Sequence, residues 1–228
     1  NGQIIGMGVS TPILLQLVTR PDKVPFKADS FDYLSSVARG ELAIVALKDA
    51  PFDDLESLVA YAKSNGPVPV AMNAKPHKLV LGAVGRATGA EFQFVNTTGG
   101  AESMKLLLGG QVMVSYAGGS HAAYLDSGDM KMIAVANENR HAYAPDVMTV
   151  AEQGYGVYLD PYFYIATTKG TPPAILEALS NAISNALESD EVVKIVRNAA
   201  KTSVLNLDPA ATRNMMVDGL PVMEKLVK

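Results

Sequence analysis

Residues 68–124 read VPVAMNAKPHKLVLGAVGRATGAEFQFVNTTGGAESMKLLLGGQVMVSYAGGSHAAY. This stretch repeats one order: a short apolar run, a polar or glycine-containing loop, and a segment with helical spacing of apolar residues. The apolar runs are Val68–Met72, Phe92–Asn96 and Val112–Tyr116. Short runs rich in Val, Phe and Tyr favour strands, and strands that alternate with helices indicate an α/β fold with parallel sheet.

The same alternation continues on both sides of this stretch. Upstream, Glu41–Leu47 predicts a strand, whereas Phe31–Ala38 is ambiguous. Asp53 and Glu56 have the spacing of a capping box, which predicts a helix beginning after Asp53. Downstream, Tyr162–Thr167 predicts a strand, followed by long helices, the last of them broken near Gly219 and Pro221.

The composition is that of a folded protein and does not indicate nucleic acid as a partner. Of its 228 residues, 48% are hydrophobic and 18% charged, which excludes a disordered chain. The net charge of −4 gives no electrostatic footprint for nucleic acid. There is no cysteine, so disulfides, thiolate catalysis and cysteine metal sites are excluded.

The loops that follow the three strands are the candidate binding site. Each loop leads into a helix, whose first N–H groups are unpaired and lie at the positive end of the helix dipole. Ligands of open α/β sheets sit at the carboxyl ends of strands, so the loops are expected to converge on one carboxylate or phosphate. The candidate residues are Asn73, Lys75, His77, Thr97, Thr98, Gly99, Gly100, Ala101, Gly118 and Ser120.

A plainer interpretation remains open, in which these loops are ordinary turns between strands and helices. Glu102 favours it, because a carboxylate in the first turn already satisfies the helix dipole. Signals for other chemistry are poor. No nucleotide-binding glycine motif follows a strand, and no metal ligands, catalytic residues or cofactor are expected. His121 and His141 are expected to be loop or surface residues.

Three motifs, in this order and spacing, identify a family. They are LLGGQV at Leu107–Val112, APDVMTVAEQG at Ala144–Gly154, and KGTPPAIL at Lys169–Leu176. The chain resembles, over nearly its whole length, the solute receptors of tripartite tricarboxylate transporters, also called Bug-type receptors.

The resemblance implies a periplasmic receptor with a type II periplasmic binding protein fold: two α/β lobes with a cleft between them. It implies a small organic carboxylate as ligand, held largely by backbone amides and ordered waters, and membrane transporter subunits as partners. Residues 1–49 and 161–228 would form the first lobe and residues 50–160 the second. Glu41–Leu47 and Tyr162–Thr167 would be the two crossings between the lobes.

This sequence departs from the family pattern in three places. Asn73-Ala74-Lys75-Pro76 replaces a Gly-Ser-rich loop, and Asn96-Thr97-Thr98-Gly99 replaces a stretch like Pro-Tyr-Lys-Gly, so the ligand's identity is left open. The family's opening strand, glycine-rich loop and helix are not matched. The first lobe is therefore expected to be incomplete at its amino end, and either to self-associate or to be less stable than an extended version.

Two other classes compete with the receptor. An effector-sensing domain of a transcription regulator has the same two-lobe architecture, and a DNA-binding helix pair upstream would indicate it. An enzyme on this fold would need converging titratable side chains, and the sequence offers few candidates.

Overall fold

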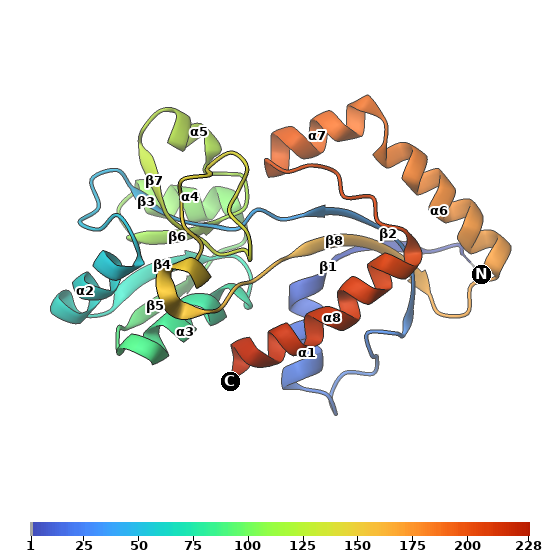
Figure 1. Cartoon of the computed structure of the whole chain (residues 1–228), viewed down its shortest axis with the longest axis horizontal. Coiled ribbons are helices and arrows are strands. Elements are labelled where there is room, and N and C mark those ends of the chain that lie inside the picture. Colours follow the sequence, from blue (N-terminus) through green and yellow to red (C-terminus); the bar gives the residue numbers. More distant parts are fainter. Residues whose placement is uncertain (1) are drawn as a thin grey trace. The chain divides into compact units, whose positions relative to one another are not determined.

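The computed structural model describes residues 2–228, which divide into two compact units. Unit 1 comprises the chain up to Gly40 and Pro161–Lys228, and unit 2 is Glu41–Asp160 (Figure 1). The sequence-based boundary at residues 49 and 50 thus differs from the observed one. Within Glu41–Leu47, expected as a crossing between lobes, residues 43–47 pair with two strands of unit 2. The other expected crossing, Tyr162–Thr167, lies inside the sheet of unit 1.

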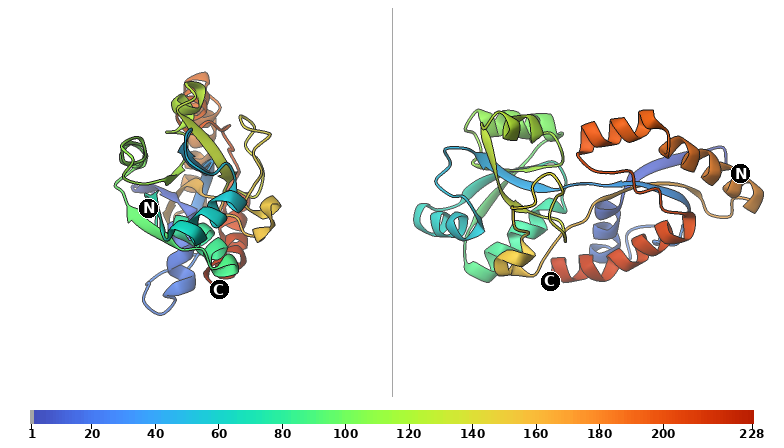
Figure 2. Two further views of the ribbon diagram at one scale, coloured as in Figure 1. Left: turned by 90° about the vertical axis from the view of Figure 1, so that its left-hand side faces the viewer. Right: turned by 45° about the horizontal axis from the view of Figure 1, so that its top comes forward.

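Unit 1 is built on an antiparallel sheet of three strands in the order β1-β8-β2. In Figures 1 and 2, α6 and α7 lie on one side of this sheet and α1 and α8 on the other. The segment that was ambiguous in sequence is the strand β2. The elements are β1 (Ile5–Val9), α1 (Ser10–Thr19), β2 (Phe31–Arg39), β8 (Tyr162–Thr168), α6 (Pro173–Leu187), α7 (Asp190–Ala200) and α8 (Pro209–Val227).

Helix α8 runs through the position where the sequence predicts a break. Pro221 lies inside it and removes one backbone donor, but buried Met216 and Met223 on either side hold the helix in place. Gly219 has a packing role: a β-carbon there would lie 2.7 Å from Leu14 Cδ1 of α1. The glycine therefore permits the close approach of α8 to α1.

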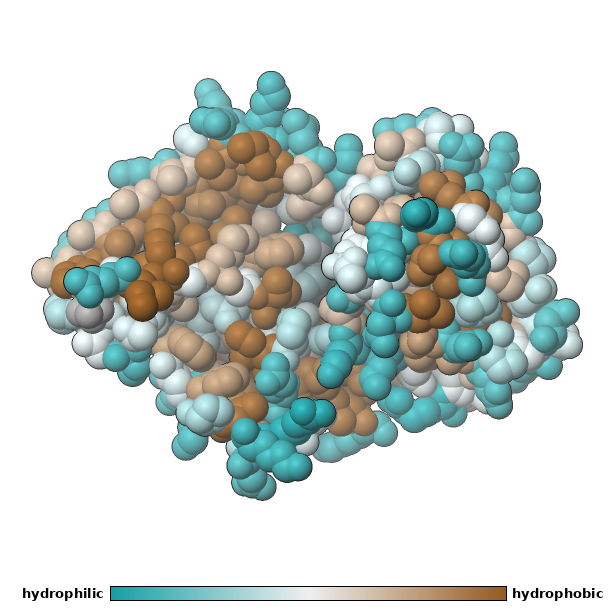
Figure 3. Space-filling view, turned by 180° about the vertical axis from the view of Figure 1, so that it is seen from behind, coloured by the Kyte–Doolittle hydropathy of each residue, from teal (hydrophilic) through white to brown (hydrophobic). Residues whose placement is uncertain are grey.

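Strand β1 and the residue before it expose apolar side chains at the edge of the unit 1 sheet. Ile4 is 73% exposed and Met7 64%. They border a cavity of about 300 Å³, to which Ile13, Phe31 and Tyr164 also contribute. Figure 3 shows apolar side chains gathered over a wide part of unit 1. Exposing such an apolar face to water is energetically unfavourable.

Unit 2 is a five-stranded mixed sheet in the order β5-β4-β6-β3-β7. β4 runs parallel to β5 and β6, whereas β3 is antiparallel to β6 and β7. The elements are β3 (Ala43–Leu47), α2 (Leu55–Asn65), β4 (Val68–Met72), α3 (His77–Thr88), β5 (Phe92–Asn96), α4 (Gly100–Leu108), β6 (Val114–Ala117), α5 (Ala122–Asp126), β7 (Met130–Val135) and the π-helical turn η1 (Ala151–Tyr155).

Strand β3, between β6 and β7, is buried on both faces. Ala43 and Val45 pack with Met104 and Leu107 of α4, and the alternate residue Ile44 is equally inaccessible to solvent. A strand covered on both faces reads as a continuous apolar run, which explains the sequence of this segment.

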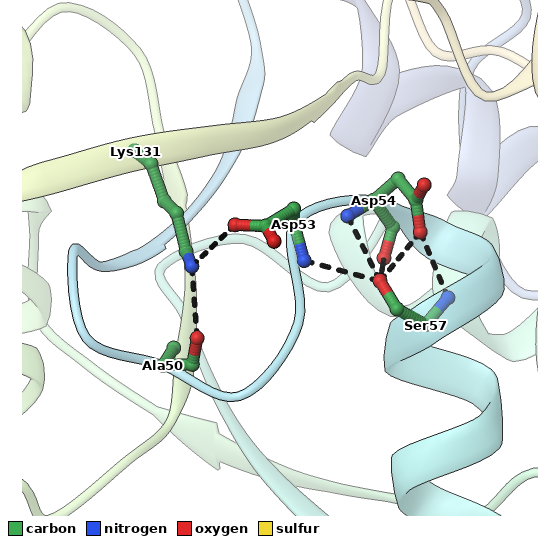
Figure 4. A network of polar contacts seen from close by, with 5 residues as sticks. All are labelled: Ala50, Asp53, Asp54, Ser57 and Lys131. Atoms are coloured by element: carbon green, nitrogen blue, oxygen red, sulfur yellow. Dashed lines mark hydrogen bonds and ion pairs between the residues drawn. The ribbon is translucent and has the colours of Figure 1, made fainter.

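The loop before α2 is fixed by the polar network drawn in Figure 4. The N-cap is Asp54 rather than the predicted Asp53. Its Oδ1 accepts a hydrogen bond from Ser57 N (2.8 Å), and Ser57 Oγ accepts one from Asp54 N (3.1 Å). Asp53 instead pairs with Lys131 Nζ of β7 at 2.6 Å. The capping box lies one residue later than expected because Ser57, and not Glu56, closes it.

Candidate functional site

The three candidate loops lie at one edge of the unit 2 sheet. β5, β4 and β6 are parallel neighbours, so their carboxyl ends share that edge. The loops that follow them, here called the edge loops, are Asn73–His77, Thr97–Ala101 and Gly118–Ser120. Thr97 N donates to Met72 O at 2.9 Å, which ties the second loop to the end of β4.

The second edge loop lies against the third, and the first lies against the strand that leads into the third. A β-carbon on Gly100 would lie 2.9 Å from Ser120 Oγ, so the second and third loops touch at this point. The His77 ring lies 5.1 Å from that of Tyr116, a residue of β6 that lies two positions before the third loop. The structure therefore brings together residues from all three predicted segments.

His77 opens α3 and is the most unusual side chain of the first loop. It is 8% exposed, and among the residues that the structure describes its Nδ1 has no hydrogen-bond partner. Burial lowers the pKa of His77 to about 4, so the ring is neutral near pH 7. It can contribute a hydrogen bond but no positive charge. Asn73 and Lys75 are exposed, which leaves Lys75 as the cation of this loop.

A side chain of α4 itself, that of Glu102, partly occupies the amino end of this helix. Glu102 Oε2 accepts hydrogen bonds from Thr98 N and Thr98 Oγ1, each at 2.6 Å. The Thr98 hydroxyl, followed by the Thr98 N–H, holds the pKa of Glu102 below its ordinary value. The N–H groups of Gly100 and Ala101 are among those that helix geometry leaves without an intrahelical acceptor. Nothing lies within 4 Å of a β-carbon placed on Gly99.

The third edge loop is shaped by its glycines. Gly119 has a φ of 106°, in a region that L side chains rarely adopt. Gly118 and Ser120 are exposed. The helix that follows, α5, has only five residues. This loop therefore offers backbone groups and the Ser120 hydroxyl, but little helix dipole.

Sequence reasoning missed a buried polar network behind the third loop. His121 and His141, expected as loop or surface residues, do lie outside the regular elements but are 0% and 1% exposed. Both contact the Tyr143 hydroxyl. The one available signal is the run of polar and aromatic residues from 137 to 143, which no local pattern connects to residue 121.

Solved structures define the class of fold. MatC from Rhodopseudomonas palustris, solved with bound malate, has a TM-score of 0.84 at 20% identity; the match covers 100% of this chain and 80% of that chain. The periplasmic binding protein BugD has a TM-score of 0.81 at 23% identity, covering 99% and 77%. The fold is therefore that of the type II-like periplasmic binding proteins, as the sequence predicted.

The family follows from the sequence match. Residues 2–228 match the tripartite tricarboxylate transporter family receptor, and the chain belongs to that family. Protein BugT of Bordetella pertussis is 28% identical over 215 residues, covering 92% of this chain and 65% of that protein. A UPF0065 protein of Cupriavidus necator is 29% identical over 170 residues, covering 69% and 49%. The chain thus spans about half to two thirds of the length of these relatives.

This family consists of solute receptors, not enzymes. Within residues 2–228, no helix combines the length and apolar character that crossing a bilayer requires.

Proposed function

We propose that this chain is the binding portion of an extracytoplasmic solute receptor that takes a small organic carboxylate at the edge loops. The observation that carries the proposal is the convergence of three parallel strands on loops that meet, with Ser120 against Gly100. Carboxyl ends of parallel strands are where ligands of α/β sheets bind.

The chemistry of the edge loops favours an anion. Helices α3 and α4 both begin there, and helix amino ends attract negative charge. Lys75 adds a positive charge at the first loop. His77 is neutral and buried, so it suits a hydrogen bond to a carboxylate or to a hydroxyl beside it.

Glu102 limits where a ligand carboxylate can bind on the second edge loop. Its carboxylate takes the donors of Thr98, so a ligand carboxylate near Thr98 would meet a like charge. Gly99, Gly100 and Ala101 are free of that competition, and the open space at Gly99 lets a ligand reach their N–H groups. We therefore assign the main anion contact to these three residues.

Similar proteins support the ligand class and the setting. MatC was solved with malate, and a second R. palustris protein, with a TM-score of 0.81 at 20% identity, was solved with adipate. Family membership supports delivery of the ligand to membrane transporter subunits, and supports a receptor over a transcriptional regulator. BugD is described as periplasmic, which supports the same location here.

Titration calorimetry with a panel of mono-, di- and tricarboxylates, including malate and adipate, tests the proposal. We expect Gly99→Val to weaken binding of the best ligand by about 10- to 150-fold, because one charge-assisted hydrogen bond contributes about 1.5–3 kcal/mol. Gly6→Val is the matched control, since it also meets open space but lies in β1 of unit 1. Equal affinity in both variants would contradict the assigned contact and favour Gly118–Ser120.

A further inference from the structure

A network of polar side chains is buried in unit 2 behind the third edge loop. Its members are Glu41, His121, Asn137, His141 and Tyr143. Asn137 and His121 are 0% exposed, and Glu41 is 6% exposed. Burying so many polar groups is costly unless they bond to one another, so their arrangement carries information.

Asn137 joins the two segments by which the chain enters and leaves unit 2. Its Oδ1 accepts from Leu42 N at 2.6 Å, and its Nδ2 donates to Asp160 Oδ1 at 2.7 Å. The amide orientation is fixed, because a donor faces one end and an acceptor faces the other. The backbone of Ala136 adds bonds to the same segments: its N donates to Leu42 O, and its O accepts from Leu159 N, each at 2.8 Å.

His141 extends this junction toward Tyr143. Its Nε2 lies 2.7 Å from Asn137 Oδ1 and 3.2 Å from Glu41 Oε2. Both atoms are acceptors, so Nε2 carries the proton. The other ring nitrogen, Nδ1, lies 2.9 Å from the Tyr143 hydroxyl.

Tyr143 connects His141 to His121. Its hydroxyl lies 2.9 Å from His141 Nδ1 and 3.0 Å from His121 Nε2, within hydrogen-bond distance of both rings. Burial, together with the nearby Glu41 charge, raises the pKa of Tyr143, which keeps this hydroxyl protonated. These contacts connect His121 through Tyr143 and His141 to Asn137 in one series.

We propose that this series positions the third edge loop, Gly118–Ser120, by tying His121 to the two segments that connect unit 2 to unit 1. His121 directly follows Ser120, and the loop itself has two glycines and leads into a helix of five residues. Such a backbone needs an outside anchor to hold one conformation. The consequence for ligand affinity rests on the function proposed above, whereas the anchoring of the loop does not.

Tyr143→Phe tests the anchor because it removes both hydrogen bonds and keeps the ring. In ligand-free protein we expect hydrogen exchange at the amides of residues 119–122 to quicken by about 5- to 30-fold, as loss of one or two hydrogen bonds implies. The imidazole ¹⁵N signal of His141 Nδ1 should also shift, because that atom loses its hydrogen-bond partner.

Tyr33→Phe is the matched control. It also deletes a buried hydroxyl, which donates to Ala28 O at 2.6 Å, but in unit 1. We expect it to leave residues 119–122 unchanged. His121→Gln keeps a side chain that can donate or accept a hydrogen bond, and should retain most of the protection that His121→Leu loses. If Tyr143→Phe and Tyr33→Phe give the same exchange at these amides, the network is merely structural and the proposal is wrong.

Ligand titration separates the two proposals. If the parent protein binds a carboxylate, Tyr143→Phe should weaken that binding by about 5- to 30-fold while Tyr33→Phe leaves it unchanged. If the parent binds no carboxylate, the proposed function fails, and the exchange measurement still decides the anchor. Quickened exchange with unaltered affinity would overturn the ligand consequence.

Discussion

His77 is a buried titratable residue of the candidate site. Its ring rests beside Tyr116, whose hydroxyl in turn accepts a bond from Leu81 N of α3 at 3.1 Å. Burial favours the neutral ring, and this preference makes the stability of the fold depend on pH.

The direction of that dependence follows from the two pKa values. In the unfolded chain His77 has the ordinary value of about 6.5, and in the fold about 4. Its contribution is therefore complete above pH 6.5 and is lost as the pH falls from 6.5 through 4. Between pH 7.5 and 4.5, urea unfolding of the parent should lose about 2–3 kcal/mol more than that of His77→Gln. Equal losses in the two proteins would show that His77 is not held neutral.

The sequence predicted which loops form the candidate site, but not which of their polar groups are already hydrogen-bonded to one another. The sequence identified the edge loops from strand, glycine and helix signals, and the structure brings them together. It could not show that Glu102 bonds to Thr98 rather than only facing the helix dipole, since both arrangements have the same spacing. Nor could it connect His121 to Tyr143, because that contact depends on the tertiary fold.

At the scale of elements, periodicity predicted most helices and strands, and the errors have physical causes. β2 was ambiguous because a strand in a three-stranded sheet, with two register shifts, does not show clean alternation. The antiparallel pairing of β3 escaped prediction because a strand buried on both faces carries no sign of its direction.

The cap of α2 gives an element-scale prediction. Asp54→Ala removes the acceptor for Ser57 N and should cost about 1 kcal/mol in the free energy of unfolding. Asp53→Ala is the control, because its pair with Lys131 is solvent-exposed and such pairs contribute about 0–1 kcal/mol. Urea unfolding should rank Asp54→Ala as the more destabilised. The opposite ranking would return the cap to Asp53, as the sequence suggested.

At the scale of the whole molecule, unit 1 has an open edge. β1 pairs with β8 on one side, and its exposed Met7, together with exposed Ile4 just before the strand, borders the apolar cavity. Unpaired edges and apolar faces favour association.

We therefore expect the chain to self-associate, or to gain thermal stability when extended at its amino end by the opening segment of a family member. Sedimentation velocity over a range of concentrations and melting of both versions would measure this. A monomer whose melting temperature equals that of the extended version would contradict the prediction.

The central claim is that a small carboxylate binds at the edge loops of unit 2. Amide chemical-shift mapping during titration with the carboxylate panel tests it most directly. We predict saturable shifts that are largest at residues 73–77, 97–101 and 118–120, with Gly100 and Ala101 foremost. Saturable shifts centred elsewhere, or none with any member of the panel, would contradict the account.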